Sequence, residues 1–222
     1  MTLDDLRDYD PAPIEWVDDV PGWLTGPEGQ TLFALGALAR GPVLEVGPWL
    51  GRSTVCIARG IAVSPEPKEF FTVELNPKAE DWELRDGLYH FRPDDSDAAF
   101  AGGTPVEDWE EDIGPVVAHP EGVIGQLEAN LRRCCVEELV QVVEGDFRHL
   151  PLHGPFAFIF TDTMHTPDEV HRNGQRLAEL LAPGGVLACH DTTPENRAAL
   201  GEFFDFDAET QVDSLFVGVA AT

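Results

Sequence analysis

Basic residues are scarce in this sequence. Its 222 residues contain 14 Lys and Arg but 41 Asp and Glu, so the formal net charge is −27 at neutral pH. An acidic excess of this size repels nucleic acid backbones and anionic lipid headgroups, because both carry dense negative charge. We therefore expect neither nucleic acid nor a membrane surface as a partner, and we interpret the charge mainly as a source of solubility.

The sequence is also poor in cysteine and has no long apolar run. The cysteines show no Cys-x-x-Cys spacing and no disulfide-like framework. They are Cys56, Cys134, Cys135 and Cys189. No run approaches the roughly 20 apolar residues of a membrane span. The N-terminal stretch MTLDDLRDYD lacks the basic start and apolar centre of a signal peptide. These absences predict a soluble, cytoplasmic protein with reduced thiols.

Short apolar runs alternate with longer amphipathic stretches through most of the chain. Expected strands lie at 42–47, 69–75, 139–145, 156–162 and 185–191. Expected helices lie at 31–40, 53–62, 122–135 and 167–182, the last starting at Thr166-Pro167 and stopped by the PGG sequence at 183–185. This alternation predicts parallel strands joined by right-handed crossovers. The expected fold is therefore α/β, a doubly wound Rossmann-like sheet with helices on both faces.

The C-terminal part departs from this alternation. Two apolar stretches, 203–209 and 214–220, are separated by only a few polar residues. Such spacing predicts an antiparallel strand pair, which would close one edge of the mostly parallel sheet. At this length the chain is expected to form a single domain, residues 1–222.

Two regions lie outside the alternation. Residues 1–30 are rich in turn formers and are expected to form an N-terminal cap segment. Residues 78–120 form an acidic insertion that nevertheless keeps several aromatic residues. These are Trp82, Tyr89, Phe91, Phe100 and Trp109. A loop this long is usually functional or disordered, and its aromatic residues argue against disorder. A substrate lid, a structural or oligomer-forming element, and a mobile loop are the three interpretations.

The first strand-to-helix turn has the sequence VLEVGPWLGRST, with Glu45, Gly47 and Gly51 at fixed spacing. In an open parallel sheet this turn faces the ligand, beyond the carboxyl ends of the strands. Gly47 would let the backbone approach a ligand closely, and Gly51 would permit a close strand–helix junction. Amide groups at the helix start can hold a carboxylate. A tight turn that binds nothing is the alternative.

The second strand ends at Glu74, where a nucleotide-binding fold places an acid that accepts hydrogen bonds from ribose hydroxyls. The turn lacks the Gly-x-Gly-x-x-Gly pattern that cradles a pyrophosphate, so a ligand with an amino acid in that place fits better than a dinucleotide. After the third strand, Asp146 is suited to accept from an adenine amino group, and Phe147 can face the adenine ring.

These motifs, together with IFTDTMH and LLAPGGVLACHD, resemble the ordered motifs of class I S-adenosylmethionine-dependent methyltransferases. The resemblance covers about residues 28–220 and is greatest to the small-molecule O-methyltransferase branch that includes macrolide-sugar enzymes. It implies that Glu45, Gly47 and Ser53 line the methionine portion of the donor. It also implies that Glu74 holds the ribose and that Asp146 and Phe147 border the adenine. Gly51 and Asp162 are assigned to the same donor site.

Four residues at the ends of two later strands form the expected reacting end: Asp162, His165, His190 and Asp191. Two carboxylates with an imidazole suit Mg²⁺, which would orient a substrate oxygen and lower its pKa. We place a candidate metal at Asp162, His190 and Asp191. The other imidazole, His165, is the candidate general base. His190 stands where some members of the resembling branch carry an acid, which leaves one hard ligand fewer. Alternatively, Asp162 caps the following helix and the His190-Asp191 pair braces a strand end.

The expected function is transfer of a methyl group from S-adenosylmethionine to a hydroxyl of a small molecule, with natural products among the candidate acceptors. Carboxylate and amine acceptors are alternatives. A nicotinamide-dependent oxidoreductase and a non-catalytic S-adenosylmethionine-binding protein are the competing interpretations. A homodimer is the default expectation for the assembly.

Overall fold

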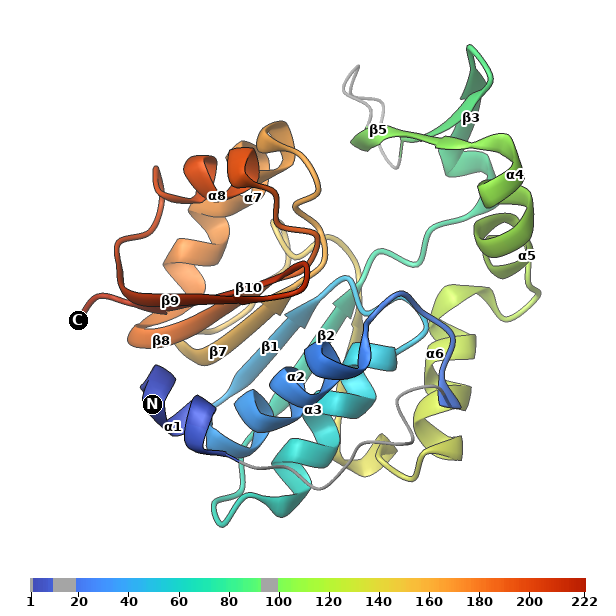
Figure 1. Ribbon diagram of the computed structural model, residues 1–222. Coiled ribbons are helices and arrows are strands. Elements are labelled where there is room, and N and C mark those ends of the chain that lie inside the picture. The colour runs from blue at the N-terminus through green and yellow to red at the C-terminus, as the bar shows by residue number, and fades with distance from the viewer. Residues whose placement is uncertain (1, 10–18, 93–99) are drawn as a thin grey trace.

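The computed structural model describes residues 2–9, 19–92 and 100–222 (Figure 1). Residues 10–18 of the N-terminal segment and 93–99 of the insertion lie outside the described residues. Within the described chain, no helix combines the length and hydropathy that a membrane span requires.

A central sheet of seven strands has the order β6-β2-β1-β7-β8-β10-β9. The strands are β1 (Val43–Val46), β2 (Phe70–Glu74), β6 (Gln141–Glu144), β7 (Phe156–Thr161), β8 (Leu181–Cys189), β9 (Phe206–Val212) and β10 (Leu215–Ala220). The first five are parallel, whereas β10 runs antiparallel to both β8 and β9. The predicted Rossmann-like sheet with a C-terminal antiparallel pair is therefore confirmed.

Helices cover both faces of this sheet, as Figure 1 shows. One layer contains α2 (Gly26–Leu38), α3 (Arg52–Val63) and α6 (Gly122–Arg133), and the other contains α7 (Pro167–Leu180) and α8 (Pro194–Leu200). Successive strand residues point to opposite faces. Val43 accordingly packs in the core beside α2 and α3, and Leu44 packs in the core beside α7. The shorter elements are α1 (Leu3–Asp8) and a 3₁₀ turn at Glu137–Leu139.

Two predicted helix boundaries need correction. Helix α2 begins at Gly26 rather than at 31, because Thr25 forms a capping box with Glu28. The segment 1–30 therefore already contains the first turn of α2. Helix α7 begins at Pro167 behind the Thr166 cap, as predicted, but it ends at Leu180. The PGG sequence at 183–185 lies inside β8, where a register shift accommodates it, rather than stopping the helix.

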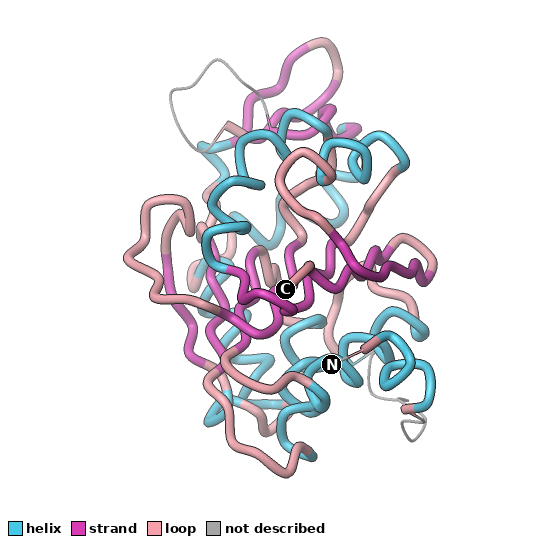
Figure 2. The backbone as a smooth tube through the Cα atoms, turned by 90° about the vertical axis from the view of Figure 1, so that its left-hand side faces the viewer, coloured by secondary structure: helices cyan, strands magenta, loops and turns pink. Residues whose placement is uncertain are grey.

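The insertion folds into a small sheet of its own, which the sequence did not indicate. Its antiparallel strands are β3 (Trp82–Arg85), β4 (Leu88–Phe91) and β5 (Phe100–Pro105). Short helical segments flank them: Ala79–Asp81, α4 (Val106–Asp108), a π-helical turn at Trp109–Ile113 and α5 (Gly114–Val117). Figures 1 and 2 both show this sheet at the outer end of the molecule, separate from the central sheet.

Candidate active site

A cavity of about 400 Å³ opens at the carboxyl ends of the central strands. Every parallel strand end contributes to its lining, and so does the small sheet of the insertion. The sequence-predicted residues that line it are Gly47, Glu74, Asp146, Phe147, Asp162, His165, His190 and Asp191. The fold thus brings the expected donor site and the expected reacting end into one space, whereas Glu45, Gly51 and Ser53 are not among the lining residues.

The two glycines of the first turn are required by close packing. Gly47 has a φ of 80°, and a Cβ there would lie 2.9 Å from the Thr163 side chain and 3.0 Å from the Asp162 carbonyl oxygen. Gly51 has a φ of 92° at the start of α3, where a Cβ would lie 2.5 Å from the Leu127 side chain. The lack of a side chain at Gly47 therefore lets the turn pack against the end of β7, and the lack of one at Gly51 lets it pack against α6.

Glu45 lies beneath this turn rather than on the cavity wall. Its fully buried carboxylate accepts hydrogen bonds from the hydroxyls of Ser53 (2.6 Å), Thr54 (2.6 Å) and Thr72 (2.7 Å). Burial raises the pKa of Glu45 despite these three bonds. This position differs from the expectation that Glu45 and Ser53 line the donor, because the two side chains bind each other and tie β1 to α3 and β2.

Glu74 reaches the cavity with its carboxylate already held in place. It accepts hydrogen bonds from the backbone N–H groups of Trp49 (3.0 Å) and Asn76 (3.2 Å). Because the side chain is almost completely buried, its pKa rises to about 7. A carboxylate oxygen accepts more than one hydrogen bond, so Glu74 retains capacity for a ligand hydroxyl.

Asp146 has a partner that sequence reasoning missed. The Arg148 Nε lies 3.0 Å and 2.9 Å from the two Asp146 oxygens, and the Arg148 backbone N–H donates to the same carboxylate at 2.9 Å. Burial alone would raise the pKa of Asp146, but Arg148 outweighs it and lowers that pKa. Phe147, almost fully buried, lines the cavity beside this pair. The Asp-Phe-Arg order was visible in the sequence, but the folding back of Arg148 was not.

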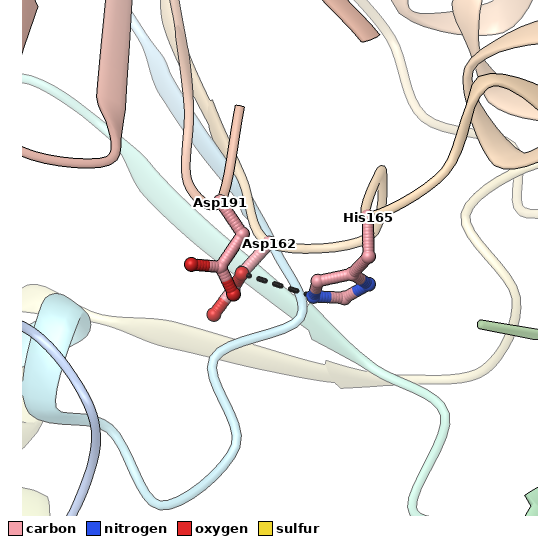
Figure 3. Close-up of side chains that lie close together, drawn as sticks. All are labelled: Asp162, His165 and Asp191. Carbon is pink, nitrogen blue, oxygen red and sulfur yellow. Dashed lines mark ion pairs between the residues drawn. The ribbon is translucent and has the colours of Figure 1, made fainter. Parts of the chain in front are cut away.

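Asp162 lies between two histidines at the reacting end. Its Oδ1 is 3.4 Å from His165 Nε2 and 3.3 Å from His190 Nδ1; Figure 3 shows Asp162 with His165 and Asp191. Burial would raise the pKa of Asp162, but the two imidazoles hold it well below its usual range. The site therefore contains a firmly ionised carboxylate that both histidines share.

His165 is held between two acids. Besides Asp162, its Nδ1 lies 3.5 Å from Glu169 Oε2, and its backbone N–H donates to the same oxygen at 2.8 Å. Burial acts to lower the pKa of His165, yet Asp162 and Glu169 raise it to about 10. At neutral pH the imidazole is therefore protonated, and it must lose this proton before it can act as the predicted general base.

His190 is buried and has both ring nitrogens beside acids. Its Nδ1 faces Asp162, and its Nε2 lies 3.3 Å from Glu28 Oε2. Burial would lower the pKa of His190, but its acidic neighbours, Asp162 foremost, raise it to about 9. Glu28 also accepts hydrogen bonds from Thr25 N–H and from the backbone and hydroxyl of Ser214. Sequence reasoning missed Glu28, whose only signal was the capping-box spacing.

The group suited to a metal differs from the predicted one. Asp162, His165 and Asp191 each offer a ligand atom, and these atoms all lie within 4.8 Å of one another. His165 takes the place expected for His190 in this group, although His190 Nδ1 also lies near both acids, 3.3 Å from Asp162 Oδ1 and 3.6 Å from Asp191 Oδ1. Asp191, with a φ of 52°, extends its half-exposed carboxylate toward this group.

Residues 44–192 match the model of a methyltransferase-domain family. The chain belongs to this methyltransferase family. With its sheet order, it is a class I S-adenosylmethionine-dependent methyltransferase. The macrolide-sugar branch expected from the motifs is not established by this match.

Solved O-methyltransferases share the methyltransferase fold at low sequence identity. TomG from Streptomyces achromogenes, solved with S-adenosylmethionine, has a TM-score of 0.52 and 16% identity over 90% of this chain and 82% of its own. An enzyme from Bacillus cereus, solved with S-adenosylhomocysteine, has a TM-score of 0.50 and 15% identity over 99% and 95%. One from Thermotoga maritima has a TM-score of 0.55 and 11% identity over 96% and 72%.

Proposed function

We propose that this methyltransferase transfers the methyl group of S-adenosylmethionine to a hydroxyl oxygen of a small molecule. The observation that carries the proposal is the shared cavity: one wall presents Glu74 and Asp146, and the same space contains the Asp162, His165 and Asp191 group. The similarity in fold to several O-methyltransferases supports an oxygen acceptor. The family match favours methyl transfer over hydride transfer to a nicotinamide.

The donor fits the cavity wall that contains Glu74, Asp146 and Phe147, which we call the donor wall. Glu74 has a buried carboxylate suited to the ribose hydroxyls, and Phe147 with Asp146 lies where the adenine would follow. Gly47 lines the same cavity at the first turn, where the methionine portion would lie. Glu45 and Ser53 would act indirectly, since their mutual hydrogen bond holds the turn in this shape.

The reaction needs a proton acceptor beside the acceptor hydroxyl. The hydroxyl oxygen attacks the methyl carbon, the carbon–sulfur bond breaks with its electrons staying on sulfur, and the hydroxyl proton leaves to a base. His165 lines the cavity and is the candidate, but it must first lose the proton that Asp162 and Glu169 stabilise. A positive charge near Asp162 would weaken its attraction for this proton. The rate of methyl transfer should therefore depend on the charges that surround Asp162.

A divalent cation fits the Asp162, His165 and Asp191 group, because carboxylate oxygens are preferred ligands of Mg²⁺. Held by the two carboxylates, it would orient the hydroxyl, lower the hydroxyl pKa and weaken the attraction of Asp162 for the His165 proton, which leaves His165 as the base. A cation that took His165 as a third ligand would occupy the nitrogen that has to accept the proton, so the two roles exclude each other. His190 is not a member of this group, but its Nδ1 lies 3.3 Å from Asp162 Oδ1 and helps to position that carboxylate.

Two measurements test the proposal. Calorimetry with S-adenosylmethionine and S-adenosylhomocysteine should show donor binding, and incubation with methyl-labelled donor and a panel of hydroxyl, carboxyl and amine acceptors should place the label on hydroxyl oxygen. Parallel reactions with a chelator and with added Mg²⁺ decide whether a cation takes part. Donor binding without label transfer to any acceptor would favour the non-catalytic binding protein. Transfer only to amines or carboxylates would contradict the oxygen acceptor.

A further inference from the structure

The cavity has a second wall that the donor does not explain. Trp82 of β3 and Tyr89 and Phe91 of β4 line the same cavity as the turn and the strand ends. Trp82 is paired across the small sheet with Phe91, and Tyr89 lies two residues from Phe91 on the same strand. Since alternate residues of a strand share a face, these three side chains form one surface of the small sheet. We call it the aromatic wall.

The rings of the aromatic wall are packed against one another. The Trp82 and Phe91 centroids lie 5.0 Å apart, and Tyr89 stacks on Trp109 with a 4.0 Å separation and a 17° interplanar angle. Trp109 also contacts Trp82 edge-on at 6.4 Å, and a Cβ at Gly114 would lie 2.6 Å from the Trp109 ring. The surface is therefore fixed before any ligand arrives, which lowers the entropic cost of binding.

The base of the insertion is tied to the central fold close to the donor wall. Asn76 follows Glu74 by two residues, and its Nδ2 donates to Glu144 of β6 at 2.9 Å. Its Oδ1 accepts from the Ile124 backbone N–H of α6 at 3.4 Å. Leu75 and Pro77, on either side of Asn76, line the cavity. These contacts fix the start of the insertion relative to Glu74, so the aromatic wall and the donor wall face one cavity in a defined arrangement.

Charge is distributed unevenly around the cavity. The ionisable lining residues come from the central fold and gather at the donor wall and the reacting end: Glu74, Asp146, Arg148, Asp162, His165, Glu169, His190 and Asp191. The described insertion residues that line the cavity are all uncharged: Trp82, Tyr89, Phe91, Gly103, Thr104 and Ile113. A charged group resting on this wall would lose its hydration without gaining an ionic partner.

We propose that the methyl acceptor is an uncharged planar aromatic compound with a ring hydroxyl, whose rings lie against Trp82, Tyr89 and Phe91. Its hydroxyl would then point across the cavity toward Asp162 and His165. The inference rests on the proposed function, and it adds the chemical class of the acceptor. Aromatic surfaces favour flat rings over saturated ones of equal size, because stacked and edge-on ring pairs contribute stabilisation beyond the buried area.

Three probes test this class on the unaltered protein saturated with S-adenosylhomocysteine. Calorimetry should show that 2-naphthol binds about tenfold more tightly than its saturated counterpart, decahydro-2-naphthol, which has a similar size and hydroxyl but no aromatic face. It should also bind more tightly than 6-hydroxy-2-naphthoate, whose carboxylate finds no basic partner on the aromatic wall. Equal affinity for the aromatic and saturated alcohols would overturn the proposal, and tighter binding of the anion would overturn its charge requirement.

Variants then locate the binding surface. Trp82→Leu and Tyr89→Leu should each weaken 2-naphthol binding several-fold and leave the S-adenosylhomocysteine affinity unchanged, whereas Tyr89→Phe, which keeps the ring, should bind like the unaltered protein. Tyr9→Leu is the matched control, because Tyr9 makes a ring contact with Phe33 away from the cavity lining. Unchanged 2-naphthol affinity in both leucine variants would place the aromatic acceptor elsewhere.

The methyl-transfer assay separates this inference from the proposed function. If the donor binds but no hydroxyl compound accepts the label, the proposed function fails, whatever the naphthol affinities are. If hydroxyl compounds accept the label but saturated alcohols are methylated as readily as 2-naphthol, oxygen methylation stands and the aromatic class fails.

Discussion

The Glu74 carboxylate is held in one position before a ligand binds. It is buried, lines the cavity and is held by the backbone N–H groups of Trp49 and Asn76. The Trp49 contact comes from the glycine turn, where Trp49 itself has a φ of 51°. The turn therefore orients the carboxylate that we assign to the ribose, so two sequence motifs that looked independent form one structure.

Replacing Glu74 should weaken the donor and remove a pH effect. Glu74→Gln is expected to raise the dissociation constant of S-adenosylmethionine about tenfold or more, since it removes a charged hydrogen-bond acceptor worth roughly 1.5–3 kcal/mol. With a pKa of about 7, Glu74 loses its charge as the pH falls, so donor affinity should be about tenfold lower at pH 6 than at pH 8. Calorimetry across this range measures both effects.

The Glu74→Gln protein serves as the reference for the pH effect, because titration of the ligand is common to both proteins. Glu138→Gln, at an exposed position on the surface, should behave like the unaltered protein. If donor affinity depends on pH in the same way in the unaltered and the Glu74→Gln proteins, Glu74 does not contact the donor in its ionised form.

With His165 as the base, turnover should be faster at alkaline pH. Its pKa of about 10 leaves it protonated at pH 7, and a base acts only after losing that proton, so turnover should rise with pH from 7 toward 10. His165→Ala should lower turnover by roughly 10²–10⁴-fold and leave donor affinity unchanged. Asp162→Asn removes the main anion beside His165, so its residual activity should reach a plateau at lower pH. In reactions without a divalent cation, a pH–rate profile that is flat from 7 to 9 would rule out His165 as the base.

At the scale of elements, the apolar pattern of the sequence was sufficient for the central sheet. Runs such as that around Phe158 are buried on both faces, so their composition directly reflects their position. The small sheet escaped prediction because β3 exposes Glu83, Leu84 and Arg85 and therefore shows no apolar alternation. Its cohesion comes from contacts among aromatic rings in different segments, and spacing along the chain does not reveal such contacts.

In the candidate site, too, some residues could be predicted from the sequence and others could not. Residues that follow a strand, such as Asp162 and Asp191, could be predicted to face one crevice because parallel strand ends share an edge. Glu28 could not, because its position beneath His190 depends on how α2 packs against the turn between β9 and β10. The candidate metal group gives a related case: whether His165 or His190 joins Asp162 and Asp191 in it depends on side-chain positions and not on strand order.

The start of α2 is expected to act on the reacting end through Glu28. Glu28→Gln removes the buried charge that accepts from Ser214 and lies beside His190, so unfolding by urea should show a loss of about 1–3 kcal/mol. Methyl transfer should fall because His190 then positions Asp162 less firmly, while donor affinity should stay the same. Glu66→Gln, on an exposed loop, is the control. Unchanged stability and turnover would show that Glu28 has no influence on the site.

The insertion should be needed for the acceptor and not for the donor. Replacing Trp82–Ile113 by a short glycine-serine linker removes the aromatic wall and keeps Asn76, which anchors the start of the insertion. Calorimetry should show unchanged S-adenosylhomocysteine affinity, and label transfer to 2-naphthol should be lost. Full transfer by the shortened protein would contradict a role for the insertion over the acceptor, and loss of the folded state would favour the structural interpretation of this region.

At the scale of the whole molecule, the cavity takes its residues from strand ends of a sheet that has a separate hydrophobic core on each face. The core beside α2 and α3 and the core beside α7 lie on opposite faces of the sheet. The donor wall draws on the ends of β1, β2 and β6, and the reacting end draws on the ends of β7 and β8. A ligand that contacts both groups of strand ends binds only when the sheet is assembled, so its binding free energy adds to the stability of the folded chain.

Saturation with S-adenosylhomocysteine should therefore raise the thermal midpoint of the entire chain in one transition. At a concentration of about one hundred times its dissociation constant, a ligand of the native state adds roughly 2.7 kcal/mol. For a chain of this size that corresponds to an increase of about 5–11 °C. Scanning calorimetry of the unaltered and Glu74→Gln proteins at one fixed ligand concentration should show a smaller increase in the variant, because its affinity is lower. Two separate transitions, of which only one responds to the ligand, would show instead that the donor stabilises part of the chain independently of the rest.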